Sequence, residues 1–170
     1  MDMILRAAAF ARKAHAQQKR KYNDRPYITH PARVAGRVAI HGLADEKMVA
    51  AAFLHDVVED TSLELDDISA EFGMEVATLV GELTNPSSGS DAPRQERKQQ
   101  DRTHLAQVSV QAKTIKLIDR IDNLQELAGA PSNFLRLYCA ESRELADVIG
   151  PADPELKSEL LDCISRLEAQ

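Results

Sequence analysis

The sequence contains no tryptophan and has only three tyrosines and four phenylalanines in 170 residues. With so few aromatic side chains, Leu, Ile, Val and Ala must fill the core, which favours helices. The apolar runs also fall short of the roughly 18 residues needed to span a bilayer, and the N-terminus lacks the uninterrupted apolar stretch of a signal peptide. The composition therefore predicts a helical protein with no membrane partner.

Cysteine is scarce as well, and basic residues are fewer than acidic ones. Cys139 and Cys163 lie far apart, imply no disulfide framework and fit a reducing cytoplasm, which is the predicted location. The 21 basic residues are outnumbered by 27 acidic ones, for a net charge of −6. This balance predicts no nucleic-acid partner, and by itself it also predicts repulsion of polyphosphates. Glycine-rich phosphate loops, cysteine-based zinc spacing and serine-nucleophile elbows are absent too.

Helical spacing dominates what is present, and no segment alternates convincingly as a strand. The clearest patterns predict helices over 3–17, 46–60, 65–72, 74–83, 94–107 and 110–127. Asp45 is a plausible N-cap, and Asp153 followed by Pro154 begins the last helix. With no internal repeat and no long linker, we predict one all-α domain over residues 1–170 with about eight helices.

A polar cluster follows residues 48–54, which are apolar on every face of a helix. If the helix continues, His55 lies above Glu59 and Asp56 lies above Asp60. Burying three carboxylates so close together costs several kcal/mol unless a cation or a proton intervenes. A divalent metal is one solution, because imidazole and carboxylate are good ligands. The alternative is that the helix reaches the surface after residue 54 and the acidic side chains are solvated.

Two other segments add polar groups in unexpected places. His30 stands at the start of a predicted helix, where a capping or core role is the alternative to metal binding. Asp119 lies on the apolar face of the long helix, between Ile118 and Ile121, and needs a partner there. Three such clues on three helices favour a shared metal centre.

The motifs around these residues resemble a known family. The segments PYITHP (26–31), LHDVVEDT (54–61) and KLIDRIDNL (116–124) are similar to the hydrolase domain of the stringent-response RelA/SpoT proteins and the small alarmone hydrolases. These belong to the HD superfamily of metal-dependent phosphohydrolases. The resemblance covers residues 4–138 and implies a single compact HD-domain helical bundle, with helices within 133–169 packed on it and no synthetase domain after it.

The resemblance also implies an activity and a cofactor. Such enzymes hydrolyse guanosine 3′,5′-bis(diphosphate), ppGpp or pppGpp, at the 3′-diphosphate, releasing pyrophosphate and GDP or GTP. One Mn²⁺ per chain is implied, with other divalent metals possible. By motif position its ligands are His30, His55, Asp56 and Asp119. Glu59 and Asp60 match the acidic pair that orients or deprotonates the attacking water.

The implied substrate contacts lie in other parts of the chain. They are Arg20, Lys21, Asn123 and Tyr138. The alternative for the basic turn 19–21 is a solvated turn. Asp122 departs from the family pattern, in which His or Tyr is common, and offers a rival metal ligand three residues from Asp119.

Two other functions stay open at this point. One is an HD phosphohydrolase that acts on another nucleotide, such as a nucleoside 5′-phosphate or the 2′-phosphate of NADPH. The other is a non-catalytic sensor that binds the alarmone without hydrolysing it. A sensor would be expected if Glu59 or Asp60 were replaced, and both are present. The sequence does not determine the oligomeric state, the regulation, the role of the 86–93 loop or the preference between ppGpp and pppGpp.

Overall fold

The computed structural model describes residues 2–127 and 129–169, and within these ranges it contains helices and no β-strand. The α-helices are α1 (Met3–Ala14), α2 (Thr29–Ala39), α3 (Glu46–Leu54), α4 (Val57–Asp60), α5 (Leu65–Phe72), α6 (Met74–Leu83), α7 (Arg94–Gln107), α8 (Val110–Gln125), α9 (Ser132–Ile149) and α10 (Pro154–Glu168). A short 3₁₀ turn, Gly150–Ala152, joins the last two. The all-α prediction is confirmed, and the helix count over the described part is close to the predicted eight.

Local chemistry explains where several helices begin. The carboxylate of Asp45 accepts the backbone N–H of Met48 at 2.8 Å and caps α3. The carboxylate of Asp153 accepts the N–H of Leu156 at 2.9 Å and caps α10, with Pro154 at the first helical position. Each side chain satisfies a backbone donor that would otherwise lack a partner at the helix terminus.

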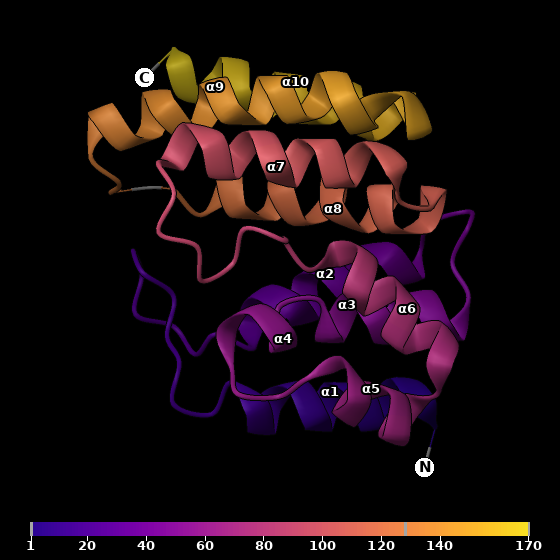
Figure 1. Ribbon diagram of the computed structural model, residues 1–170. Helices are drawn as coiled ribbons and strands as arrows, with labels where there is room; N and C mark the ends of the chain where they lie inside the picture. Colours follow the sequence, from indigo (N-terminus) through magenta and orange to yellow (C-terminus); the bar gives the residue numbers. More distant parts are fainter. Residues whose placement is uncertain (1, 128, 170) are drawn as a thin grey trace.

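The helices form two halves that meet at α8. Figure 1 shows α1 to α6 in the lower half and α7 to α10 stacked in the upper half, with the two termini at opposite ends. Helix α8 contacts α2, α3 and α6 on one side and α9 and α10 on the other. Polar side chains on α8 can therefore meet side chains of the N-terminal half inside the protein.

The prediction of one continuous helix over 46–60 is wrong. Helix α3 ends at Leu54, a turn follows at His55 and Asp56, and α4 is a separate single turn. The ring Nδ1 of His55 lies 2.7 Å from the carbonyl oxygen of Ala52, so this side chain takes a backbone acceptor at the end of the helix. A side chain that bonds to a backbone oxygen competes with the backbone N–H groups that would continue the helix, and such competition favours a helix end.

Two helix ends also differ from the predicted bounds. Helix α1 ends at Ala14 rather than at residue 17, and α8 ends at Gln125 rather than at 127. No helix within the described residues is both long enough and apolar enough to cross a membrane.

Candidate active site

Two buried histidines face each other where α2 meets the end of α3. The side chains of His30 and His55 are 0% and 1% exposed, and their Nε2 atoms lie 3.2 Å apart. The Nδ1 of His55 faces a carbonyl oxygen, which only accepts, so this nitrogen carries a proton. The Nδ1 of His30 lies 2.6 Å from a carboxylate oxygen of Asp122. Both rings therefore present Nε2 to the space between them.

Two aspartates complete this cluster. Asp56 Oδ2 lies 3.0 Å from His55 Nε2 and 3.5 Å from His30 Nε2. Asp119 Oδ1, from α8, lies 3.2 Å from His30 Nε2 and 3.6 Å from His55 Nε2. Candidate ligand atoms of His30, His55 and Asp56 all lie within 4.8 Å of one another. The structure thus brings together all four residues that the motifs predicted as metal ligands.

Partners from its own helix hold Asp119 in place on the apolar face of α8. The ammonium of Lys116, which is itself buried, lies 3.1 Å from Oδ2, and the Nδ2 of Asn123 donates to Oδ1 at 2.6 Å. These contacts supply the partners that the sequence indicated an aspartate would need there.

The electrostatics of the cluster favour positive charge. Burial lowers the pKa of His30, but hydrogen bonds to Asp119 and Asp122 outweigh it and raise the pKa to about 11. For His55, burial is likewise outweighed, by the charge of Asp56 above all, and its pKa rises to about 9.

The same cluster holds its carboxylates ionised. Burial raises the pKa of Asp119, but the charge of Lys116 and the hydrogen bonds from His30 and His55 bring it well below its ordinary value. Two imidazole nitrogens among carboxylate oxygens are a donor set that suits a divalent metal, which would supply the positive charge in place of ring protons. The residues present therefore fit the divalent metal that an HD domain implies.

The acidic pair beside the cluster has two different environments. Glu59 is partly buried, and it accepts the backbone N–H of Asn85 at 2.7 Å and its Nδ2 at 3.1 Å. Burial raises the pKa of Glu59, although Lys116 and Asn85 act in the opposite direction. Asp60 is exposed, and its Oδ2 accepts a hydrogen bond from the side-chain Nε2 of Gln18 at 2.7 Å.

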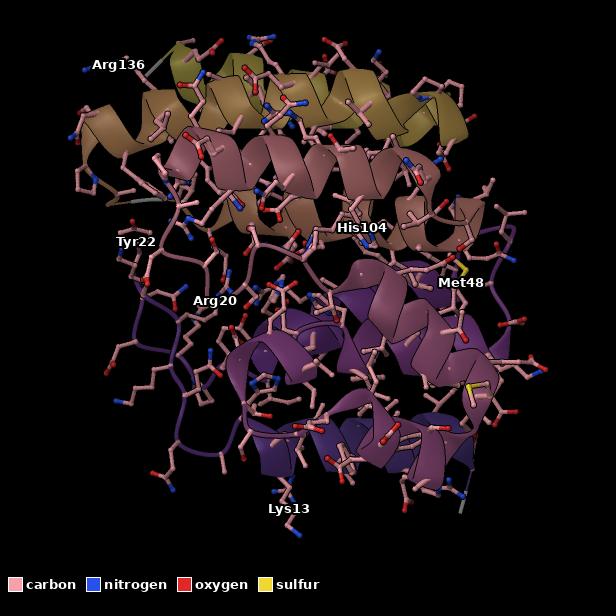
Figure 2. The ribbon with its side chains drawn as sticks, viewed as in Figure 1. Lys13, Arg20, Tyr22, Met48, His104 and Arg136 are labelled. Atoms are coloured by element: carbon pink, nitrogen blue, oxygen red, sulfur yellow. The ribbon has the colours of Figure 1, made fainter. Side chains whose placement is uncertain are left out.

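A pocket of about 280 Å³ lies next to the cluster, between the loop after α1, the end of α8 and the start of α9. All four predicted substrate-binding residues line it: Arg20, Lys21, Asn123 and Tyr138. Figure 2 labels Arg20 and Tyr22 on the same side of the molecule, on the loop that borders this pocket. The structure therefore gathers the predicted substrate contacts in one place.

Cations and aromatic rings together form the rim of the pocket. Arg20 Nε lies 2.7 Å from Glu126 Oε2, and its Nη2 donates to Asn123 at 2.7 Å. The ammonium of Lys21 lies 5.4 Å from the ring centre of Tyr22 and 5.5 Å from that of Phe134. The net charge of −6 does not describe this local surface, so it is a poor guide to whether a polyphosphate can bind here.

Sequence reasoning missed several residues that join or support these features. The hydroxyl of Tyr27 donates to Asp56 Oδ2 at 2.7 Å, and Tyr27 also lines the pocket. Tyr27 lies inside the PYITHP motif, so its position in that motif could have identified it as a site residue. Asn85 is 26 residues from Glu59 and carried no local signal. Asp122 was considered as a rival ligand, but it contacts Nδ1 of His30, on the side of the ring away from the cluster.

A helical protein that gathers two histidines and two aspartates in its interior belongs to a recognisable class of protein. A sequence model described as "HD domain" matches residues 7–145, which is most of the chain. The span includes all three motifs and the whole His-Asp cluster.

Curated relatives narrow the class to one kind of enzyme. The guanosine-3′,5′-bis(diphosphate) 3′-pyrophosphohydrolase MESH1 of Xenopus tropicalis is 41% identical over 128 residues, 74% of this chain and 69% of that protein. A probable guanosine-3′,5′-bis(diphosphate) 3′-pyrophosphohydrolase of Synechocystis is 40% identical over 153 residues, 88% of this chain but only 19% of that protein.

A solved structure agrees with both comparisons. It belongs to a metazoan orthologue of SpoT described as hydrolysing ppGpp, and it is 30% identical with a TM-score of 0.88 over 98% of this chain and 96% of that one. The chain thus belongs to the HD-domain family and, within it, to the guanosine-3′,5′-bis(diphosphate) 3′-pyrophosphohydrolases.

Proposed function

We propose that this protein hydrolyses ppGpp or pppGpp at the 3′-diphosphate and releases pyrophosphate, with GDP formed from ppGpp and GTP from pppGpp. The observation that carries the proposal is the position of the His-Asp cluster beside the pocket that Arg20 and Lys21 border. Tyr27 belongs to both, because it lines the pocket and its hydroxyl donates to Asp56. A nucleotide in the pocket would place a phosphoryl group next to the cluster.

We propose Mn²⁺ as the metal, held by His30, His55, Asp56 and Asp119. When bound, a divalent cation lowers the pKa of a water molecule and polarises a phosphoryl oxygen. The protein contributes two imidazoles with Nε2 turned inward, which would be neutral once the metal replaces the ring protons, and two carboxylates whose pKa is held below its ordinary value.

Glu59 is the proposed general base, with Asp60 orienting the attacking water. Burial makes Glu59 a stronger proton acceptor than a solvated carboxylate, and the two bonds from Asn85 hold it in one orientation. Asp60 is more exposed than Glu59 and is bonded to Gln18 in the loop after α1.

The pocket residues hold the rest of the substrate. Arg20 and Lys21 are the proposed phosphate contacts, since guanidinium and ammonium groups form strong charge-assisted hydrogen bonds to phosphate oxygens. Asn123 and Tyr138 are the proposed contacts to the ribose or base. Tyr138 lies against Arg120, whose guanidinium carbon is 4.5 Å from its ring centre, and this contact orients the ring.

We further propose that residues 1–170 act as one hydrolase domain in the cytoplasm. A single cluster of buried apolar residues runs from α1 to α10, which supports one domain. Cys139 and Cys163 are both buried free thiols, which are stable in a reducing compartment.

One assay tests the proposed activity. Purified protein is incubated with ppGpp and Mn²⁺, and pyrophosphate release is measured beside an EDTA-treated sample and the His55→Ala variant. We expect release that EDTA and His55→Ala abolish. Release that survives EDTA contradicts the metal mechanism. Nucleotide binding without turnover identifies a sensor, and phosphate release from a nucleoside 5′-phosphate or NADPH but not from ppGpp identifies another substrate.

A further inference from the structure

The side of His30 that faces away from the cluster is also built from polar groups. Asp122 is one turn after Ile118 on α8, and its side chain is only 4% exposed. One of its oxygens, Oδ2, lies 2.6 Å from Nδ1 of His30. The imidazole is thus held at one nitrogen by Asp122, while the other nitrogen faces His55 and Asp119.

Arg33 fixes Asp122 from α2. It lies one turn after His30, and its Nε and Nη2 donate to the two oxygens of Asp122 at 2.7 Å and 2.9 Å. The same Nη2 lies 2.7 Å from Oε1 of Glu126. Two parallel hydrogen bonds from a planar guanidinium define the orientation of a carboxylate, which a single point charge cannot do.

These contacts close a ring that joins the cluster to the pocket. From Glu126 the chain of hydrogen bonds continues to Arg20, then to Asn123 and back to Asp119 in the cluster. Asp122 and Arg33 therefore connect the proposed metal site to the proposed phosphate contacts through hydrogen bonds, without lining the pocket.

We infer that Asp122, oriented by Arg33, is a positioning residue that sets the metal affinity of this enzyme through His30. A carboxylate that accepts the Nδ1 proton of a histidine fixes the ring and makes Nε2 a better donor to a metal. Asp122 acts from the opposite side of the ring and is not itself a ligand. The inference rests on the metal site of the proposed function.

The experiment compares metal affinity in a graded set of variants. Asp122→Asn keeps an acceptor for Nδ1 but loses the charge, and Asp122→Ala loses both. Arg33→Gln removes the fork that orients Asp122. The control is Arg37→Gln, because Arg37 also lies on α2 and also forms two hydrogen bonds to a carboxylate, but its partner is Glu159 on α10. Mn²⁺ binding is measured by calorimetric titration, and thermal unfolding in EDTA verifies that each variant folds.

We expect Mn²⁺ affinity to fall by about 10-fold to 100-fold in Asp122→Ala, which is the range for lost partners of metal-binding histidines, and by less in Asp122→Asn and Arg33→Gln. Arg37→Gln should bind Mn²⁺ like the wild type. Raising Mn²⁺ should restore much of the lost pyrophosphate release, which a general structural defect would not allow.

Failure of the inference is separable from failure of the proposed function. If the wild type binds Mn²⁺ and the folded Asp122 and Arg33 variants bind it within about twofold as tightly, the positioning role is wrong and the metal site stands. If Asp122→Ala does not fold, Asp122→Asn and Arg33→Gln decide by the same criterion. A wild type that binds no metal overturns both.

Discussion

The buried cluster and the pocket beside it are both polar, but they are built in different ways. In the cluster, His30, His55 and Asp119 are 6% exposed or less, and each is held by a further protein group. At the rim, Lys21 is exposed and comes from a loop. Polar groups that are buried and mutually bonded are costly to disturb, whereas exposed ion pairs contribute little to stability. The cluster is therefore preorganised for a metal. At the rim the exposed Lys21 can turn toward a substrate, whereas Arg20 is only 13% exposed and is already bonded to Glu126 and Asn123.

Removing a cluster carboxylate should give the largest effect. Asp119→Ala should reduce pyrophosphate release by about 10³-fold or more, because a bound metal contributes several kcal/mol of transition-state stabilisation. It also leaves the buried Lys116 without its partner, at a cost of about 3–5 kcal/mol in folding stability. Activity assays and urea denaturation measure the two effects.

Asp101→Ala is the matched control for this change. Asp101 is also buried and also pairs with a lysine three residues before it, Lys98 at 3.1 Å, but it lies on α7 outside the cluster. The Asp101→Ala variant should lose folding stability but bind Mn²⁺ as tightly as the wild type. Near-normal turnover in Asp119→Ala would show that the cluster is not the catalytic centre.

Replacing the proposed base should separate chemistry from metal binding. Glu59→Gln should lower kcat by about 10²-fold to 10⁴-fold, the usual contribution of general base catalysis, while Mn²⁺ affinity stays near that of the wild type. Asn85→Ala, which frees the Glu59 carboxylate, should lower kcat by a smaller factor. Steady-state kinetics and metal titration test this, and a parallel loss of metal affinity would make Glu59 a ligand instead.

Substitutions at the rim should act mainly on substrate binding. Arg20→Ala and Lys21→Ala should each raise KM by about tenfold, since one hydrogen bond to a charged group contributes about 1.5 kcal/mol or more. The difference from wild type should shrink at high salt.

Lys13→Ala is the control for the rim. Lys13 lies on α1, and Figure 2 shows it pointing away from the rest of the molecule. Its KM for ppGpp should match that of the wild type. A large loss of kcat with unchanged KM in the Arg20 or Lys21 variants would place these residues in the chemical step.

The smallest effect should come from a helix cap remote from both regions. Asp153→Ala removes the cap of α10 and should cost about 1 kcal/mol, or about 2–4 °C in Tm, with turnover unchanged. Burial raises the pKa of Asp153, but its bonds to the N–H of Leu156 and to His41 outweigh this and lower the pKa below the ordinary value. The stability that ionised Asp153 contributes is thus complete above about pH 4, which is the ordinary pKa of an aspartate. It is lost as the pH falls through the lower pKa of Asp153 in the folded protein. The Tm values of the wild type and Asp153→Ala, measured by thermal melts across this pH range, should converge at low pH. A difference in Tm that persists there would contradict the capping role.

Much of the fold was predictable because helix boundaries depend on local chemistry. The predicted bounds of α5, α6 and α7 are confirmed, since Gly73 separates the first two and Pro93 precedes the third. The helix over 46–60 was predicted as continuous because the apolar segment 48–54 runs straight into residues 55–60 without a glycine or proline between them. At the end of α3 the ring of His55 contacts the backbone oxygen of Ala52, and periodicity does not report a side-chain contact of this kind.

The candidate site was predictable to the extent that its residues lie in recognisable motifs. The predicted ligands converge, and so do the predicted substrate contacts. Asn85 and Arg33 were missed because their partners, Glu59 and Asp122, are on other elements. Asp122 was recognised as a departure from the family pattern, but because it is only three residues from Asp119 it was interpreted as a rival metal ligand.

The sequence by itself determined the helical class, most helix ends and the residue types that a metal-dependent phosphohydrolase needs. Only the tertiary structure decided which nitrogen of His30 faces the cluster and which faces Asp122, 92 residues away. Periodicity and motifs describe neighbours along the chain, whereas the direction of a ring depends on the packing of α2 against α8. The −6 charge shows the same limit, because the sequence sums the charges and only the fold separates a buried acidic cluster from a basic rim.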